Sequence, residues 1–400
     1  MVLVDLAEIR SGIAKNSNTA ITNPVFVHYL RVANVQDGFL DLTEMSQLQV
    51  NRDDIKRYAV LPGDMLMNEG GDLDKLGRGA LWSGEFSPCV HQNHVFVVRC
   101  GSSLLPAYLK AWTGSSAARK YFLLAGRQTT NLASINKTSL GLLPVPLPSS
   151  RAEQEAIAEA LSDADALIES LDQLIVKKRQ IKQGAMQELL TGKRRLPGFN
   201  GEWKKLLIKD IADVKTGPFG SALHESDYAK NGTPIITVEH LGEFGVTRKN
   251  LPLVSDEDCK RLSAYTLKSG DIVFSRVGSV DRNSLISEAE SGWLFSGRLL
   301  RVRVNKERVF SPYLSFQFHT HSFKQLVLAV AVGQTMASLN TIILQNISVT
   351  LPPLAEQAAI ATVLSDMDTE LAALEVRLTK AQKIKQGMMQ ELLTGKIRLR

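Results

Sequence analysis

Two nearly identical stretches divide the chain into halves, and they constrain its fold more than any other feature. Residues 181–196 read IKQGAMQELLTGKRRL and residues 384–399 read IKQGMMQELLTGKIRL, so fourteen of sixteen aligned positions are identical. The offset between the stretches is 203 residues in a chain of 400 residues. A repeat with so long a period indicates one structural unit that is present twice.

Shorter matches extend the repeat across both halves. Residues 5–12 align with 210–217, 63–67 with 270–274, 71–75 with 278–282, and 133–136 with 337–340. The offset drifts between 203 and 207, which indicates small insertions within a shared fold. Between these segments the two halves differ widely in sequence.

Each half begins with a region of mixed secondary structure. Short apolar runs bounded by Gly, Asn, Asp and Pro predict strands at 25–29, 95–98, 235–238, 271–274 and 299–304. Residues 106–114 and 312–329 are expected to be helical. Proline-containing joints at 142–148 and 349–353 favour an extended backbone before the next element.

A long amphipathic helix is predicted after each joint. Ser150 and Glu153 have capping-box spacing, and Gly192 and Gly395 suit the left-handed residue after a helix end. The first helix, over 151–191, would be roughly 60 Å long. Apolar or small residues alternate in steps of four and three, which is a heptad seam. The seam residues are Ile157, Leu161, Ala164, Ile168, Leu171 and Ile175, with Ile360, Leu364, Met367, Leu371, Leu374 and Leu378 each 203 positions later.

Because a lone helix would leave its seam in water, we expect the two long helices to pair antiparallel about a pseudo-two-fold axis. The alternative is that each helix packs only on its own globular region. The position-by-position match of the two seams favours the pair. The predicted fold class is therefore α+β, with mixed regions at 1–148 and 197–352 and helical spacers at 149–196 and 353–400.

Composition indicates a globular protein, with 44% hydrophobic and 22% charged residues. Three cysteines are too few for a disulfide framework, which favours a reducing cytoplasm. No secretory leader is recognisable at the start, and no apolar run is long enough to span a bilayer. The net charge of +6 mildly favours a polyanionic partner.

Catalytic and metal-binding motifs are not recognisable in the sequence. The stretch from Gly184 to Lys193 resembles a phosphate-binding loop only superficially, because Arg194 follows the Gly-Lys pair and the spacing is wrong. The seven histidines have no cysteine or carboxylate beside them at metal-ligand spacing. We therefore expect neither a catalytic residue nor a metal or cofactor site in this chain.

Polar loops at matching places in both halves are the candidate binding residues. Arg, Lys, Asn and Gln can bond base edges, and Ser, Thr and backbone N–H groups can hold phosphates. In the first half the candidates are Arg31, Asn34, Gln36, Asn68, Gly71, Lys75, Arg78, Arg127, Gln128, Thr129, Asn131 and Asn136. In the second half they are Gly217, Phe219, Gly220, Ser221, Glu239, His240, Arg276, Gly278, Arg282, Asn283, Gln334, Thr335 and Asn340. Any one of them could be an ordinary turn residue, but their recurrence in both halves favours a binding surface.

With these features the chain resembles a specificity subunit of a type I restriction–modification enzyme. The resemblance rests on the repeated IKQG-x-MQELLTGK stretches, on the Ala-Glu-Gln or similar helix openings at 152–154 and 355–357, and on segments 29–34, 61–64 and 217–221. It covers essentially the whole chain. One departure is that residues 201–203 have no counterpart before residue 5, so a few leading residues would complete the pattern.

The resemblance implies a non-catalytic DNA-binding subunit. Each globular region would be a target recognition domain that reads one half of a split, asymmetric DNA site. The helix pair would set the distance between half-sites and dock two methyltransferase subunits, through which ATP-dependent restriction subunits join. S-adenosylmethionine, ATP and Mg²⁺ would be used by those partners, and a flipped adenine would be methylated in each methyltransferase subunit.

Two other classes of function compete with this interpretation. A coiled-coil scaffold whose globular regions bind proteins would lack the steep loss of affinity with salt that DNA binding shows. A fused enzyme would need a methyltransferase or nuclease domain, and the repeat accounts for nearly all residues.

Overall fold

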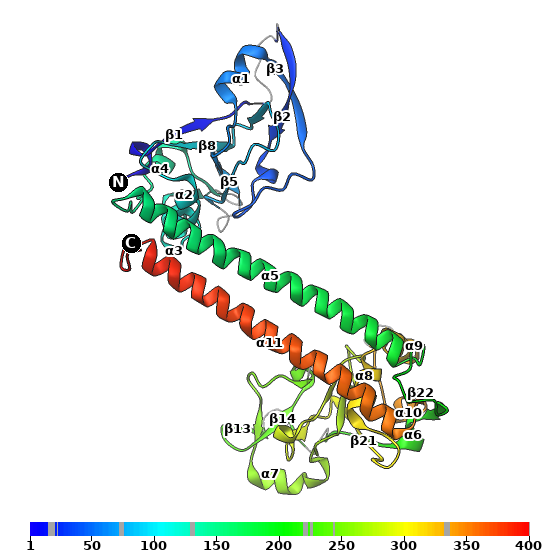
Figure 1. Cartoon of the computed structure of the whole chain (residues 1–400). Helices are drawn as coiled ribbons and strands as arrows, with labels where there is room; N and C mark the ends of the chain where they lie inside the picture. The colour runs from blue at the N-terminus through cyan, green and yellow to red at the C-terminus, as the bar shows by residue number, and fades with distance from the viewer. Residues whose placement is uncertain are drawn as a thin grey trace. The chain divides into compact units, whose positions relative to one another are not determined.

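The structure is a computed structural model that describes residues 1–14, 21, 23–71, 76–128, 133–218, 223–224, 227–242, 245–331 and 337–399. The chain forms two compact units (Figure 1). Unit 1 comprises Met1–Asp172 and Val376–Arg400, and unit 2 comprises Gln173–Glu375. Unit 1 therefore combines the two ends of the chain, whereas unit 2 is continuous.

Three small sheets make up the β structure described for unit 1. The central sheet has the order β1-β8-β4-β6, and the others are β3-β2-β7 and β5-β10-β9. Strand β4 pairs antiparallel with both β6 and β8, and its four residues are all buried. The strands are β1 (Ala7–Ser11), β2 (Pro24–Leu30), β3 (Ser46–Asn51), β4 (Met65–Asn68), β5 (Gly70–Gly71), β6 (Gly79–Leu81), β7 (Cys89–His91), β8 (Val95–Cys100), β9 (Arg127–Gln128) and β10 (Ala133–Ser134).

The helices of unit 1 cover this sheet and lead into the long helix α5. Ser115 begins α3 by accepting a hydrogen bond from Ala118 N, and Asn136 begins α4 by accepting one from Ser139 N. The helices are α1 (Arg52–Tyr58), α2 (Pro106–Thr113), α3 (Ser116–Ala125), α4 (Lys137–Gly141) and α5 (Arg151–Leu189), with 3₁₀ turns η1 (Leu3–Asp5) and η2 (Val32–Asn34).

Unit 2 repeats the central sheet of unit 1 in the order β12-β21-β18-β19. A second sheet has the order β13-β17-β14-β20, and β15-β16 and β11-β22 are two-stranded. The strands are β11 (Lys204–Leu207), β12 (Ala212–Thr216), β13 (Tyr228–Ala229), β14 (Thr233–Ile236), β15 (Leu241–Gly242), β16 (Gly245–Val246), β17 (Leu253–Val254), β18 (Ile272–Ser275), β19 (Asn283–Leu285), β20 (Leu294–Phe295), β21 (Leu299–Val304) and β22 (Ser348–Leu351).

The helices of unit 2 also follow the order seen in unit 1. They are α6 (Ile208–Ile211), α7 (Asp256–Arg261), α8 (Ser311–Phe318), α9 (His321–Val330), α10 (Thr341–Gln345) and α11 (Leu354–Leu392), with 3₁₀ turns η6 (Val238–His240), η7 (Ser263–Tyr265) and η8 (Glu288–Glu290). The predicted helix over 312–329 is wrong as a single element. Thr320 starts a new helix there, because its hydroxyl oxygen accepts a hydrogen bond from Phe323 N.

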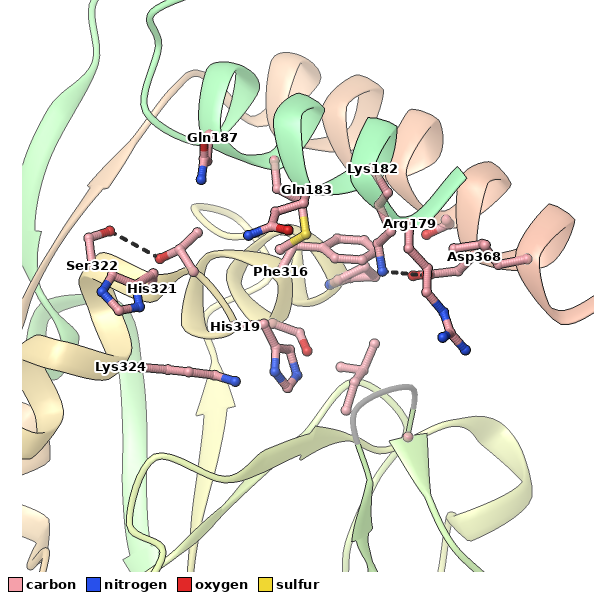
Figure 2. A pocket seen from close by; sticks show the side chains of 18 of the residues that line it. Arg179, Lys182, Gln183, Gln187, Phe316, His319, His321, Ser322, Lys324 and Asp368 are labelled. Atoms are coloured by element: carbon pink, nitrogen blue, oxygen red, sulfur yellow. Dashed lines mark hydrogen bonds and ion pairs between the residues drawn. The ribbon is translucent and has the colours of Figure 1, made fainter. Parts of the chain in front are cut away.

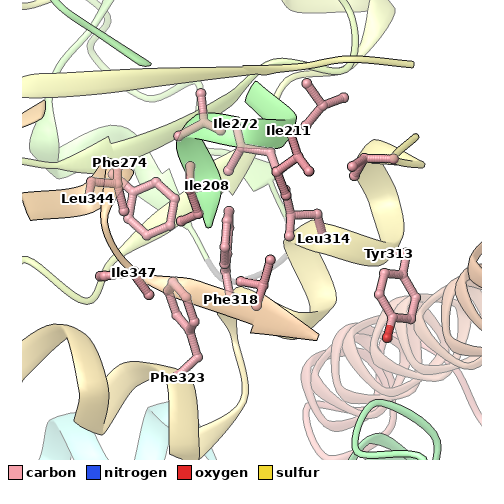
Figure 3. Close-up of a cluster of buried hydrophobic side chains, with 14 of the residues drawn as sticks. Ile208, Ile211, Ile272, Phe274, Tyr313, Leu314, Phe318, Phe323, Leu344 and Ile347 are labelled. Carbon is pink, nitrogen blue, oxygen red and sulfur yellow. The ribbon is translucent and has the colours of Figure 1, made fainter. Parts of the chain in front are cut away.

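The core of unit 2 lies between its central sheet and these helices (Figure 3). Phe274 of β18 meets Phe318 of α8 edge to face, with ring centroids 4.9 Å apart. Phe318 in turn packs against Phe323 of α9, with ring centroids 4.5 Å apart. Because aromatic rings bury large areas and pack with defined geometry, this cluster fixes β18 against α8 and α9.

Repeated ion pairs tie the same loop to the same strand in both units. The Asp64 carboxylate accepts from Arg99 and from Leu61 N, and the Asp271 carboxylate accepts from Arg303 and from Lys268 N. Both carboxylates are buried. In each unit this ion pair holds the turn before the central strand, which is β4 in unit 1 and β18 in unit 2. The strand therefore begins, and ends, at an equivalent place in the two units.

The two long helices pair antiparallel, as can be seen in each unit separately. In unit 1 the start of α5 lies beside the end of α11, where Lys385 bonds Asp165. In unit 2 the end of α5 lies beside the start of α11, where Lys182 bonds Asp368. Seam residues of both helices are buried, among them Ile157, Leu161, Leu171, Ile175, Ile360, Leu364, Leu371 and Leu374. The predicted fold class, two mixed regions with an antiparallel helix pair and an internal repeat, is thus confirmed.

An arginine near the end of each repeated stretch pairs with a glutamate at the start of the opposite helix. Arg195 donates two hydrogen bonds to the Glu356 carboxylate, at 2.5 and 2.7 Å, and Arg398 bonds Glu153 in the same way. The capping box predicted at Ser150 is only half formed. Ser150 accepts from Glu153 N, but the Glu153 carboxylate is bound by Arg398, which also lowers the pKa of Glu153.

The first prediction concerns the Arg195–Glu356 pair. Glu356 has no exposed surface, so replacing its partner leaves a buried carboxylate uncompensated. We expect Arg195→Ala to destabilise unit 2 by about 3 kcal/mol. Urea unfolding followed by circular dichroism would measure this loss. The matched variant Arg398→Ala should cost less, because Arg398 is half exposed. Equal effects of the two variants would contradict the argument.

The second prediction concerns His91, which is buried in unit 1 and donates from Nδ1 to Val95 O at 2.6 Å. Burial lowers the pKa of His91 to about 4, whereas a histidine in the unfolded chain titrates near 6.5. The unfolded state therefore binds more protons between these pH values, and stability should fall as pH drops from about 6.5 to 4, by ~3 kcal/mol in total.

Urea midpoints of the wild type and of His91→Gln, measured across this pH window, would isolate the contribution of His91. We expect the variant to lose less stability on acidification. Identical pH profiles for the two proteins would show that His91 does not stay neutral in the fold.

Candidate nucleic-acid interface

In unit 1, three segments meet where the central strand β4 ends. The backbone N–H of Glu69 donates to His94 O at 2.9 Å, and Glu69 O accepts from Ile135 N at 2.7 Å. Next to this point, β10 pairs with β5 at Gly71 and with β9 at Arg127 and Gln128. The structure thus brings Gly71, Arg127 and Gln128 together in one small sheet, with both long side chains exposed.

A loop around η2 lies against the same strand end. Asn34 is buried, accepts from Arg31 N at 2.9 Å and donates to Asp41 O at 2.8 Å. Asn68 reaches the loop from β4 and donates to Val35 O at 2.9 Å. Arg31 donates to Glu44 O, and Gln36 donates to Ala33 O. The polar side chains of this loop therefore mainly hold its own backbone in shape.

Unit 2 has the same three-segment arrangement after β18. The backbone N–H of Arg276 donates to Arg298 O at 2.8 Å, and Arg276 O accepts from Leu339 N at 2.8 Å. Gly278 is exposed with φ +78° and donates to Ala337 O at 2.9 Å. The guanidinium of Arg276 donates to Gly297 O at 3.3 Å. The predicted residues Arg276 and Gly278 therefore lie beside the segment that precedes Asn340.

The loop of unit 2 that corresponds to η2 is η6. His240 is buried at the position of Asn34 and accepts at Nδ1 from Thr237 N, 3.1 Å away. The exposed Arg282 donates to Leu241 O and so attaches this loop to the segment before β19. Glu239 is exposed and accepts from the Thr237 hydroxyl. Asn283 is buried and donates to Asp281 O at 3.4 Å.

Four other predicted residues have clear structural positions. Asn136 and Asn340 are exposed and start α4 and α10, where each side-chain oxygen accepts a backbone N–H at 2.8 Å. A Cβ at Gly217 would lie 2.1 Å from Ser296 O, so only glycine fits there. Arg78, the residue directly before β6, is half-buried.

Some of the predicted residues are buried, and others are exposed or half-buried. Burial alone does not test whether any of them contacts DNA. Asn68, Asn283 and His240 each have one buried polar atom without a partner among the described residues: Asn68 Oδ1, Asn283 Oδ1 and His240 Nε2. The Nε atoms of Arg31 and Arg78 are also buried without a partner. DNA contact by every predicted residue stays a prediction. Lys75, Thr129, Asn131, Phe219, Gly220, Ser221, Gln334 and Thr335 lie outside the described residues.

Two residues at the strand-end junctions were missed by the sequence argument. His94 and Arg298 both lie just before the strand that pairs with β4 or β18, and both are exposed. The loops that hold them are short and have no shared motif. Only the alignment of Arg99 with Arg303 on the following strand would have indicated that these positions correspond.

A second candidate surface is a groove of about 1180 Å³ in unit 2, beside the end of α5 (Figure 2). Lys182, Gln183 and Gln187 face it from α5, and His319 and Lys324 face it from the α8–α9 side. Burial lowers the pKa of His319 to about 4, so that its imidazole is neutral at pH 7. Besides amides, hydroxyls and ammonium groups, the groove is lined by the carboxylates of Glu290 and Asp368 and by the guanidinium groups of Arg179 and Arg248.

Unit 1 contains a corresponding groove of about 390 Å³ beside the end of α11. The positions that line it from the helix are the repeats of those in unit 2: Lys385, Gln386 and Gln390. The opposite wall differs, because Gly114 and Arg119 of unit 1 stand where unit 2 has His319 and Lys324. The wall formed by the long helix is therefore the same in both grooves, whereas the wall formed by the rest of each unit differs.

Within the part of the chain that the structure describes, no group of three or more His, Cys, Asp or Glu side chains could hold a metal ion. The three cysteines are free. In the described residues, no helix is both long enough and apolar enough to cross a bilayer.

Comparisons with known proteins agree with this geometry. The family model described as "Type I restriction modification DNA specificity domain" matches residues 200–386. A protein of Methanocaldococcus jannaschii assigned as the specificity subunit of type I restriction enzyme MjaX is 27% identical over 420 residues, which cover 100% of this chain and 93% of that protein. The StySPI specificity subunit of Salmonella potsdam is 24% identical, over 93% of this chain and 82% of its own length.

A solved structure shows the same fold. The S subunit of a type I restriction–modification system from M. genitalium matches with a TM-score of 0.61 and 14% identity, over 98% of this chain and 95% of that chain. The repeated stretches, the antiparallel helix pair and the two mixed units are accompanied by similarity to these relatives. The chain is similar over most of its length to type I restriction enzyme specificity subunits, and residues 200–386 match the model of their DNA specificity domain.

Proposed function

We propose that this chain reads a bipartite, asymmetric DNA site, and that each mixed α/β region reads one half of it. The observation that carries the proposal is the junction at the end of β4 and of β18. Its backbone hydrogen bonds are the same in both units, whereas its side chains are Glu69 and His94 in unit 1 and Arg276 and Arg298 in unit 2. Reading two different half-sites requires different side chains, and the same backbone arrangement can present both sets.

The helix pair suits the role of a spacer between the half-sites. Helices α5 and α11 have 39 residues each, so that each is roughly 60 Å long. Cross-helix ion pairs in each unit, Lys385 with Asp165 and Lys182 with Asp368, interrupt the apolar seam and oppose sliding of one helix along the other. A fixed helix register would give a fixed number of unread base pairs between the half-sites.

The grooves beside the long helices suit the docking of two methyltransferase subunits. The exposed residues Gln183, Gln187 and Thr191 recur unchanged as Gln386, Gln390 and Thr394, although none of them belongs to the helix seam. Identical exposed walls in two otherwise different units favour two copies of one partner. Restriction subunits would join through the methyltransferase subunits.

Catalysis is assigned to the partners in this proposal. The methyltransferase subunits would use S-adenosylmethionine, and the restriction subunits would use ATP and Mg²⁺. The chain itself would bind double-stranded DNA in the cytoplasm, where the reducing conditions suit its three free cysteines. The competing scaffold function has no observation that favours it over DNA reading.

The third prediction tests the DNA target in the native host. Methylated adenines should be mapped across the genome with the gene for this chain present and with it deleted. We expect one bipartite motif, with roughly three and four specified bases around a fixed gap, to lose methylation when the gene is deleted, because unmodified half-sites are no longer brought to the methyltransferase. An unchanged map, in cells that express the partner subunits, would contradict the proposal.

The fourth prediction tests the spacer. Inserting one helical turn in the Gly192 region, where α5 ends with φ +71° at Gly192, should lengthen the helical spacer by about 5 Å. At 3.4 Å per base pair, the gap in the methylated motif should change by about one or two base pairs. Both half-site sequences should stay the same. A change in the half-site sequences with a constant gap would refute the role of the helices as a ruler.

A further inference from the structure

The strand-end junctions differ from the other predicted loops in one respect. Backbone groups make the joining hydrogen bonds, Glu69 N to His94 O and Arg276 N to Arg298 O. Among the described junction side chains, only that of Arg276 is seen to bond the backbone, at Gly297 O. By contrast, Asn34 and His240 are buried and bond the turns in which they lie. Side chains at the junction can therefore be exchanged while its backbone hydrogen bonds stay the same.

We propose that these junctions are the specificity-determining positions of the two units. Arg298, supported by Arg276, reads a guanine in the half-site of unit 2. Glu69, oriented by His94, accepts from the exocyclic amino group of a cytosine or adenine in the half-site of unit 1. This inference rests on the proposed function and adds to it the residues and the base chemistry that distinguish the halves.

The chemistry of unit 2 fits guanine. Two arginines meet there, and the Arg298 side chain is exposed while its backbone oxygen is held by Arg276. Arg276 itself is anchored through Nη1 to Gly297 O at 3.3 Å. A guanidinium that projects from a fixed loop can donate two parallel hydrogen bonds to O6 and N7 of guanine, which is the commonest specific contact in the major groove.

The chemistry of unit 1 fits a base that presents an amino group. The Glu69 carboxylate accepts from His94 Nδ1 at 2.7 Å, and its side chain is 29% exposed. A carboxylate repels phosphates, so that on a DNA-reading surface it stabilises a complex mainly by accepting from the N4 amino group of cytosine or the N6 amino group of adenine. His94 fixes one carboxylate oxygen and leaves the other available.

The assignment predicts which half of the motif each substitution changes. The chain would be purified in complex with its methyltransferase subunits and used to select sites from duplexes randomised around the native motif. Arg298→Ala should reduce discrimination at one guanine of one half-site by roughly tenfold, and Glu69→Gln should reduce discrimination at one base of the other half-site by a similar factor. All remaining positions should be read as before.

A matched control lies beyond the other end of β21. Lys306→Ala removes an exposed cation beyond the opposite end of β21, and it should leave discrimination unchanged at every position. The inference is overturned if Arg298→Ala keeps full discrimination and only lowers the salt dependence of binding, because that identifies a phosphate contact. It is overturned for unit 1 if Glu69→Gln leaves the motif intact, because Glu69 and His94 are then an ordinary surface pair.

Failure of the proposed function would be distinguishable from these outcomes. If the wild-type complex selects no motif at all, the DNA-reading function itself is refuted. If the wild type selects a bipartite motif and the variants select the same motif with the same discrimination, only the assignment of the junction residues is refuted.

Discussion

The structure depends on a small set of charged contacts that join the start of each long helix to the end of the other. Arg195 with Glu356 and Lys182 with Asp368 do this in unit 2, and their repeats Arg398 with Glu153 and Lys385 with Asp165 do it in unit 1. Unit 1 is built from the two ends of the chain, and its core includes Leu392 and Leu393 of the C-terminal segment. Hydrophobic seams alone would allow several registers, whereas a lysine within a seam requires its carboxylate partner at one position.

The two units share one backbone arrangement and carry different side chains on it. The central sheets have the same strand order, and the same backbone hydrogen bonds close the junction after β4 and β18. The buried Asp64–Arg99 and Asp271–Arg303 pairs keep this frame constant from the other end of the strand. The side chains at the junction differ: unit 1 has a carboxylate and an imidazole there, and unit 2 has two guanidinium groups.

Much of this architecture could be predicted from the sequence, because it depends on periodicity. The repeat, the heptad seam and the glycines at the helix ends are local patterns, and Gly192 and Gly395 indeed adopt positive φ values of 71° and 73°. Long-range pairing was harder to predict. Glu153 has capping-box spacing, but its carboxylate is bound by Arg398, which no local pattern indicates. The break between α8 and α9 was missed, although the polar run at 319–322 interrupts the apolar pattern and Thr320 is a suitable helix-starting residue.

The candidate site was predictable as a set of loops and less so residue by residue. Polar residue type suggested Asn34, Asn68 and Asn283, but these side chains are buried and hold loops in place. His94 and Arg298 had no motif to mark them, and their place beside the ends of β4 and β18 follows from the pairing of β8 and β21 with those strands. Residue type indicates which side chains can bond a base, whereas the pairing of distant strands decides which of them are presented to solvent.

The central claim is that a helix pair of fixed register holds two readers at a fixed separation. Binding of the complex with its methyltransferase subunits should be measured on duplexes that keep both half-sites and vary only the number of base pairs between them. The account predicts one gap length with high affinity and a steep loss when a single base pair is added or removed. Equal affinity over a range of gap lengths would show that the helices do not fix the separation.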